Sequence, residues 1–190
     1  PPRSTLFPYT TLFRPGRRLV YWLTGAEAGC EVPGALTNKI YDGEYEVATT
    51  LTQTQLEAAI ADGQIVFHRV GADIRVLSDV NSLTTYTDTK GKIFAKNEVV
   101  RVIDMIANKT SDLFGSTYVG AVANNQDGRM GLWSDLAQMH RSLEQSNVIL
   151  NWDSGDLDVR AGEEKGDVVV NDAITIAGTM EKLYMTVVVS

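Results

Sequence analysis

"GLWSDLAQMHRSLEQSNVIL" (residues 131–150) is the stretch in which the spacing of apolar residues changes from helical to extended. Its first part repeats apolar side chains every three or four residues, at Leu132, Leu136, Met139 and Leu143. That spacing places them on one helix face. After Asn147 the spacing shortens to two residues, which is typical of strands. The stretch therefore predicts an amphipathic helix over roughly 129–146, followed by a sheet.

A second amphipathic helix is predicted upstream, over roughly 94–114. Its apolar stripe consists of Val99, Ile103, Ile106 and Leu113. Between the two predicted helices lies the polar run 124–128, "NNQDG". Asn, Asp and Gly favour turns and helix N-caps, so this run predicts the connection between the helices.

Downstream of residue 147 the sequence predicts four short strands separated by turn-rich segments. They are "VILNW", "LDVRA", "DVVVNDAITI" and "EKLYMTVVVS", at residues 148–152, 157–161, 167–176 and 181–190. This pattern favours a small, mostly antiparallel sheet. The last predicted strand has apolar side chains on both faces, so it needs cover on two sides.

The N-terminal half has weaker but readable signals. An apolar segment over 19–39 is compatible with a short helix. Thr52 and Gln55 have the spacing of a capping box, which predicts a helix that ends at Gly63. Two β-prone runs on either side of Gly71 predict a hairpin. The polar run 81–93 reads as a linker, and the predicted fold class is α+β.

Composition is that of a globular chain of 190 residues, with 44% hydrophobic residues and a net charge of −7. Residues 1–18 hold four arginines and no acid, so the remainder carries −11. An acidic body argues against nucleic-acid binding. No apolar run approaches the ~20 residues that span a bilayer. The single Cys30 excludes an internal disulfide and any multi-cysteine metal site.

Residues 1–16, "PPRSTLFPYTTLFRPG", differ from the rest of the chain. They contain four of the five prolines, which disfavour a regular helix or a central strand. The segment looks like translated sequencing-adaptor DNA, and we interpret it as adaptor-derived. The alternative is a natural disordered arm.

Motifs of enzymes are missing from the sequence: it has no G-x-S-x-G, G-x-G-x-x-G or Walker loop. A hydrolase-like enzyme, the least favoured alternative, would need His68 or His140 as its base. A calcium-dependent β-rich binding module is another alternative, since seven carboxylates lie between Asp153 and Asp172. Their spacing does not match an EF-hand loop, so solvated turns explain them better. We predict no enzyme activity, no cofactor and no metal site.

Most of the chain from Gly25 onward resembles the contractile tail sheath proteins of phages and defective prophages of Gram-positive bacteria. The resemblance lies in the order and spacing of six strings, none diagnostic alone. They are "LTNKIYDGEYEV", "TQTQLEAAIADGQIVFH", "VLSDVNSLTTYTDTKGK", "KNEVVRVIDMIANKTSDLF", "YVGAVANNQDGRMGLWSDL" and "GDVVVNDAITIAGTMEKLYMTVVV".

The resemblance implies a C-terminal fragment of a sheath subunit. Residues 17–80 would be the truncated end of the α/β, subtilisin-like middle domain, and 81–190 the C-terminal domain with a terminal arm at 167–190.

Such subunits form hexameric rings that stack as a helical sheath around a tail tube and contract to drive it through a cell envelope. Implied partners are other copies of the chain, the tube protein, and baseplate and terminator proteins. Nucleic acid and membrane insertion are not implied. The implied location is the virion tail, assembled in the host bacterial cytoplasm.

The resemblance also implies a role for the last residues, because sheath subunits exchange terminal strands with their neighbours. We predict that the end of the chain projects and adds to a neighbour's sheet by β-augmentation. The predicted subunit-interaction residues are Leu183, Tyr184, Met185, Thr186, Val187, Val188 and Val189. The alternative is that this strand pairs within its own chain, with "DVVVNDAITI".

Overall fold

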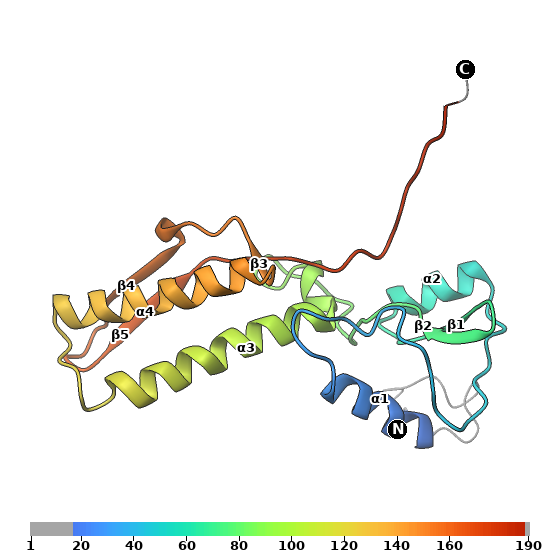
Figure 1. The fold of residues 1–190 in the computed structure, drawn as a ribbon, viewed down its shortest axis with the longest axis horizontal. Coiled ribbons are helices and arrows are strands. Elements are labelled where there is room, and N and C mark those ends of the chain that lie inside the picture. The colour runs from blue at the N-terminus through green and yellow to red at the C-terminus, as the bar shows by residue number, and fades with distance from the viewer. Residues whose placement is uncertain (1–16, 189–190) are drawn as a thin grey trace. The chain divides into compact units, whose positions relative to one another are not determined.

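The computed structural model describes residues 17–188 and separates into two compact units (Figure 1). Unit 1 comprises the described residues up to Val99 together with those from Thr179 onward, and unit 2 comprises residues 100–178. The boundary falls in the first turn of α3 (Asn97–Leu113). The hypothesis about residues 1–16, and the predicted interaction residue Val189, lie outside the described residues.

Unit 1 contains α1 (Arg17–Ala28), α2 (Gln53–Ala61), and an antiparallel hairpin of β1 (Phe67–Val70) and β2 (Asp73–Val76). The predicted capping box of α2 is confirmed: the Thr52 side chain accepts from the Gln55 N–H, and the Gln55 side chain accepts from the Thr52 N–H. Gly71 begins the predicted hairpin turn with φ of 61°, a conformation that favours glycine. A 3₁₀ turn, η2 (Lys92–Ala95), leads towards α3.

The core of unit 1 is built around three aromatic rings from α1, the following loop and β1. Trp22 meets Tyr41 edge-on with ring centroids 4.9 Å apart, and Phe67 lies within 6 Å of both rings. These rings enclose buried aliphatic side chains that include Leu36, Val47 and Val76. Burying large rings in offset contacts stabilises a small core strongly, which explains why this short hairpin holds α1.

Unit 2 begins with α3 and a turn of π-helix, η3 (Phe114–Tyr118). The chain then forms α4 (Gln126–Gln145), capped by Asn125, whose side chain accepts from the Gly128 N–H. Four short strands follow: β3 (Ile149–Leu150), β4 (Leu157–Ala161), β5 (Val168–Asp172) and β6 (Thr175–Ile176). A 3₁₀ turn, η4 (Ser154–Asp156), precedes β4. The pairs are antiparallel, β3 with β6 and β4 with β5.

The predicted helix faces need two corrections. On α3 the buried apolar residues are Val99, Val102 and Ile106, so Val102 takes the place expected for Ile103. On α4, Leu132, Leu136 and Leu143 are buried as predicted, but so are Ala137 and His140, while Met139 is only partly buried. The difference on α4 follows from the width of its contact, because α4 packs against both β3 and β4 with more than a narrow stripe.

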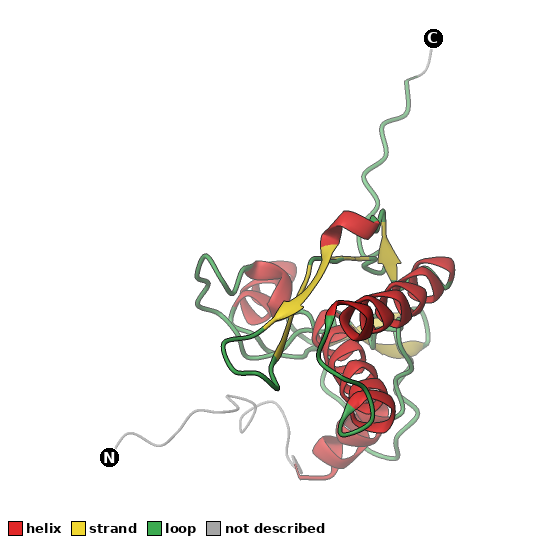
Figure 2. Cartoon of the chain, turned by 90° about the vertical axis from the view of Figure 1, so that its left-hand side faces the viewer, coloured by secondary structure: helices red, strands yellow, loops and turns green. Residues whose placement is uncertain are grey.

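The predicted strand 167–176 is two strands rather than one. β5 pairs with β4, whereas β6 pairs with β3, and Ala173 between them donates to the Asp156 carbonyl. The last predicted strand, 181–190, is not a strand within the described residues: 181–188 have no ladder partner and run as an irregular segment (Figure 2). Pairing with residues 167–176 of the same chain is therefore not observed.

Candidate functional site: the C-terminal arm and its root

The C-terminal segment has two parts, which we call the root (Thr179–Lys182) and the arm (residues 183–188). The arm carries large apolar side chains that are largely exposed: Leu183 86%, Tyr184 88%, Met185 76%, Val187 70% and Val188 87%. Odd-numbered and even-numbered residues of an extended segment point to opposite sides, so both faces of the arm are apolar apart from Thr186. Such a surface is unusual for a chain that remains alone in water.

The root, in contrast, is held by specific polar contacts. The Glu181 carboxylate accepts hydrogen bonds from Thr37 Oγ1 at 2.9 Å and from Ser78 Oγ at 3.3 Å. Its other oxygen forms an ion pair with Lys96 Nζ at 2.5 Å, and Lys96 Nζ also donates to Ser78 Oγ at 2.9 Å. One carboxylate therefore joins three segments of unit 1.

A second contact holds the root two residues earlier. Thr179 donates from its hydroxyl and from its backbone N–H to Glu98 Oε2, at 2.7 and 3.3 Å. Glu98 is buried in the first turn of α3. Met180, between the two anchored residues, is fully exposed. The root is therefore fixed along one side only.

The groups that receive the root are themselves held in place. Thr37 Oγ1 accepts from the Asp79 N–H at 3.0 Å, and the buried Asp79 carboxylate accepts from the Leu36 N–H at 2.9 Å. Asn97 Nδ2 donates to the same carboxylate at 2.8 Å. Because these contacts do not involve the root, they favour a preorganised receiving surface.

Electrostatics keep Glu181 ionised. Partial burial alone would raise the pKa of the Glu181 carboxyl, but the hydrogen bonds from Lys96 and Thr37, with the attraction of the Lys96 charge, lower that pKa below its usual value. The anionic form is therefore the form that binds the root to unit 1 at neutral pH.

The two histidines that a hydrolase would need lie in different surroundings. His140 is buried, with Nδ1 2.8 Å from the Leu136 carbonyl and Nε2 2.7 Å from Asp172 Oδ2. Both neighbours are acceptors, so the protonated ring donates from both nitrogens, and these contacts leave neither nitrogen facing a substrate site. His68 lies on β1 opposite Arg75, and burial together with the Arg75 charge lowers its pKa.

The carboxylates between Asp153 and Asp172 stabilise their own turns. Asp153 accepts from the Gly155 N–H, and Asp156 accepts from the Asp153 N–H, which forms a capping box around η4. Asp158 lies near Arg160 and accepts from Asn171. Within residues 17–188, no group of three or more His, Cys, Asp or Glu side chains is placed to hold a metal ion.

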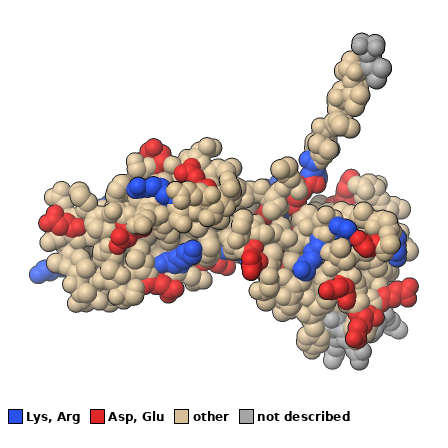
Figure 3. All heavy atoms as spheres, in the orientation of Figure 1, with Lys and Arg blue, Asp and Glu red and all other residues tan. Residues whose placement is uncertain are grey.

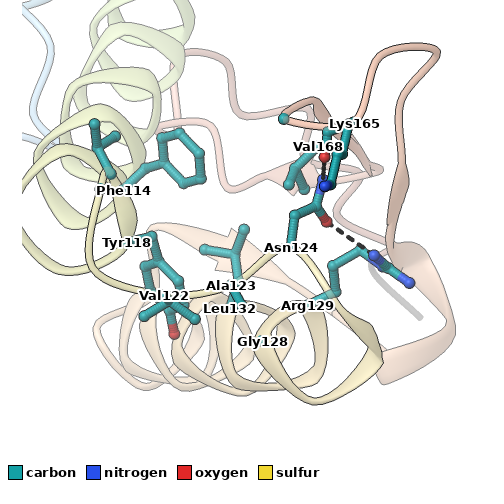
Figure 4. A pocket seen from close by; sticks show the side chains of 13 residues that line it. Phe114, Tyr118, Val122, Ala123, Asn124, Gly128, Arg129, Leu132, Lys165 and Val168 are labelled. Atoms are coloured by element: carbon teal, nitrogen blue, oxygen red, sulfur yellow. Dashed lines mark hydrogen bonds between the residues drawn. The ribbon is translucent and has the colours of Figure 1, made fainter.

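Unit 2 also contains a pocket of about 580 Å³ between the end of α3, the start of α4 and the β4–β5 turn (Figure 4). Its apolar lining includes Phe114, Leu132 and Val168. Asn124 lies at one side, where it accepts from Arg129 at 2.8 Å and donates to the Asp167 carbonyl at 2.7 Å. These bonds hold the β4–β5 turn against the start of α4.

Tyr118, at the end of η3, also faces this pocket. Its hydroxyl donates to Asp135 at 2.6 Å, and burial together with that carboxylate raises the pKa of Tyr118 to about 12. The phenol therefore stays protonated and connects η3 to α4. The face shown in Figure 3 carries acidic and basic side chains in small separate groups, without a large basic patch. None of the helices among the described residues is long and apolar enough to span a bilayer.

Comparisons with known proteins identify the class of protein to which this chain belongs. Residues 89–190 match the phage tail sheath C-terminal domain, and residues 4–82 match the phage tail sheath protein central domain. The chain belongs to the phage tail sheath family, as its sequence resemblance implied. This is a family of structural sheath proteins.

Individual relatives agree with this assignment. The chain is 28% identical over 182 residues to the phage-like element PBSX protein XkdK of Bacillus subtilis, covering 89% of this chain and 38% of that protein. The sheath tail protein of Desulfitobacterium hafniense is similar in structure, with a TM-score of 0.78, 34% identity, and coverage of 88% of this chain and 39% of that one. This chain therefore spans less than half the length of these relatives.

A more distant structure shares the fold alone. It is the helical sheath of the anti-feeding prophage in its contracted state, with a TM-score of 0.63, 14% identity, and coverage of 90% of this chain and 49% of that one. The predicted α+β class, with two long helices and small antiparallel sheets, is confirmed by these neighbours.

Sequence reasoning predicted a projecting arm but missed the root. Thr179 lies in the predicted turn between two strands and Glu181 begins the last predicted strand, and nothing nearby in sequence marks their partners. The partners Thr37, Ser78, Lys96 and Glu98 lie more than 80 residues away. The only available signal was the change from the polar Thr179, Glu181 and Lys182 to an uncharged, mostly apolar run from Leu183.

Proposed function

We propose that this chain is the C-terminal part of a contractile tail sheath subunit, and that its arm joins it to a second copy by β-augmentation. The observation that carries the proposal is the arm itself: apolar on both faces, exposed, and without a strand partner among the described residues. Family membership supplies the context, because sheath proteins such as that of the anti-feeding prophage form a helical sheath.

The physical argument for a neighbour concerns both the backbone and the side chains. Burial of each large apolar side chain contributes about 1.5–3 kcal/mol, while ordering each backbone residue costs about 1–2 kcal/mol. Side-chain burial alone therefore barely offsets the ordering of the arm. Ladder hydrogen bonds to another strand supply the additional stabilisation, and β4–β5 is a two-stranded sheet of suitable length in each copy.

The wider role is proposed on the same basis. Copies of the subunit would form hexameric rings stacked around a tail tube, bounded by baseplate and terminator proteins, and assembled in the host bacterial cytoplasm. Contraction would then drive the tube through a cell envelope. Energy for contraction would come from a lattice assembled in a metastable state, with the arms keeping subunits connected as they rearrange. Residues 17–80 would belong to the middle domain and 81–190 to the C-terminal domain.

Self-association of the chain with an altered arm tests this proposal. We expect the chain to form oligomers or polymers in sedimentation velocity and negative-stain electron microscopy. Truncation after Lys182, or Val187→Asp, should leave a folded monomer, because the arm makes few contacts with its own unit. Val119→Asp is the matched control, since Val119 is an exposed apolar residue of unit 2. Unchanged self-association after truncation would refute the proposal.

A further inference from the structure

We propose that Glu181 is a positioning residue: its ion pair with Lys96 fixes the point and direction from which the arm leaves unit 1 before a neighbour binds it. This inference rests on the proposed function of the arm. It goes further by assigning a role to four residues, which we call the latch: Glu181, Lys96, Thr37 and Ser78. The latch holds the start of the arm in a fixed position and direction.

The first argument is that donors from separate segments of unit 1 converge on the Glu181 carboxylate. Thr37 lies in the loop after α1, Ser78 follows β2, and Lys96 stands between η2 and α3, yet all three donate to one carboxylate. The Lys96 and Glu181 side chains are 28% and 21% exposed, so water screens their interaction less than it screens a surface pair. Three donors from three separate segments on one carboxylate indicate a built binding site for Glu181 and not a chance contact.

The second argument is the alternation along the segment. Thr179 and Glu181 face unit 1, whereas Met180 between them is fully exposed. Leu183 and Met185 continue the same alternation and would face the same side, but both are more than three-quarters exposed. Anchoring therefore stops abruptly at Glu181, where the apolar arm begins.

The third argument is the consequence of fixing this point. An extended chain advances about 3.3 Å per residue, so release of the four root residues would let the start of the arm move by roughly 13 Å. A held root confines the arm to a small volume and lowers the entropy lost when a second copy binds it. The latch therefore affects the concentration needed for association more than it affects the fold.

A distance measurement on the monomer tests the latch without requiring assembly. Nitroxide labels at Asp62→Cys and Lys182→Cys, in a Cys30→Ala background, report the distance between α2 and the root by pulsed electron resonance. We expect a narrow distribution that broadens at least twofold in Glu181→Ala and in Lys96→Met. The exchanged pair Glu181→Lys with Lys96→Glu should narrow it again, while the exposed control Glu163→Gln should leave it unchanged. An equally narrow distribution in both single variants would overturn the latch.

A second measurement connects the latch to association. We expect Glu181→Ala to raise the concentration for half-maximal self-association about tenfold, the scale of one charge-assisted hydrogen bond, without shifting the thermal unfolding midpoint of unit 1 appreciably. The exchanged pair should recover most of this loss. If truncation of the arm leaves association unchanged, the proposed function fails, but the monomer distances still decide whether the latch exists. If Glu181→Ala broadens the distances and leaves association unchanged, the positioning role is refuted.

Discussion

The His140–Asp172 pair predicts a specific pH dependence for the stability of unit 2. Burial alone would lower the pKa of His140, but the hydrogen bonds to Asp172 and to the Leu136 carbonyl, with the attraction of the carboxylate, raise it above its usual value. A raised pKa in the folded state stabilises the fold fully below the unfolded value of about 6.5. That stabilisation is lost as the pH rises through the folded-state pKa.

The informative perturbation is Asp172→Asn, which retains an acceptor for Nε2 and removes the charge. A hydrogen bond to a charged group is worth about 1.5–3 kcal/mol and a neutral one about 0.5–1.5 kcal/mol. We therefore expect Asp172→Asn to lower the free energy of unfolding by about 1–2 kcal/mol at pH 6. Well above the folded-state pKa the imidazole is neutral in both proteins, so the difference should shrink.

Urea unfolding at several pH values, followed by tryptophan fluorescence, measures this difference. Trp152 stacks on the His140 ring with centroids 5.2 Å apart, so its emission reports on this part of unit 2. His68→Gln is the matched control: the pKa of His68 is lowered, mainly by burial, so its contribution to stability changes with pH in the opposite direction. A stability profile unaffected by Asp172→Asn across this pH range would refute the reasoning.

Two further predictions concern the fold. Leu136→Ala removes a fully buried side chain from the core of α4 and β4, and should lower the free energy of unfolding by about 2–5 kcal/mol in the same urea assay; a loss below 1 kcal/mol would mean that the site collapses or is not core. Asn125→Ala removes the N-cap of α4 and should cost about 1 kcal/mol, visible as a lower thermal midpoint by circular dichroism, whereas Asn125→Asp should retain most of the stability.

Local patterns predicted the elements of this chain well where local chemistry determines them. The capping box at Thr52, the turn at Gly71 and strand 157–161 match the structure because each depends on residues close in sequence. The buried face of α4 was predicted incompletely, since His140 is polar and becomes a core residue only through Asp172, 32 residues away. Periodicity contains no information about such distant partners.

The C-terminal segment shows more clearly that local sequence patterns do not reveal distant partners. Its β-branched, apolar residues predict a strand, yet a strand requires a partner for its backbone hydrogen bonds, and the described residues of this chain provide none. That the arm forms a strand with a neighbouring copy therefore stays a prediction. The sequence could not indicate where the arm finds a partner, or that Glu181 anchors its root.

Hydrogen–deuterium exchange of the arm amides is the most direct test of the central claim that the arm acquires its partner strand from another copy. In the monomer, amides of residues 183–188 should exchange as fast as those of an unstructured peptide. In the assembled state every second amide of the arm should be protected by at least a hundredfold, because only the N–H groups that point to the partner strand form ladder hydrogen bonds, which must open before exchange. Equally fast exchange in both states would contradict the account.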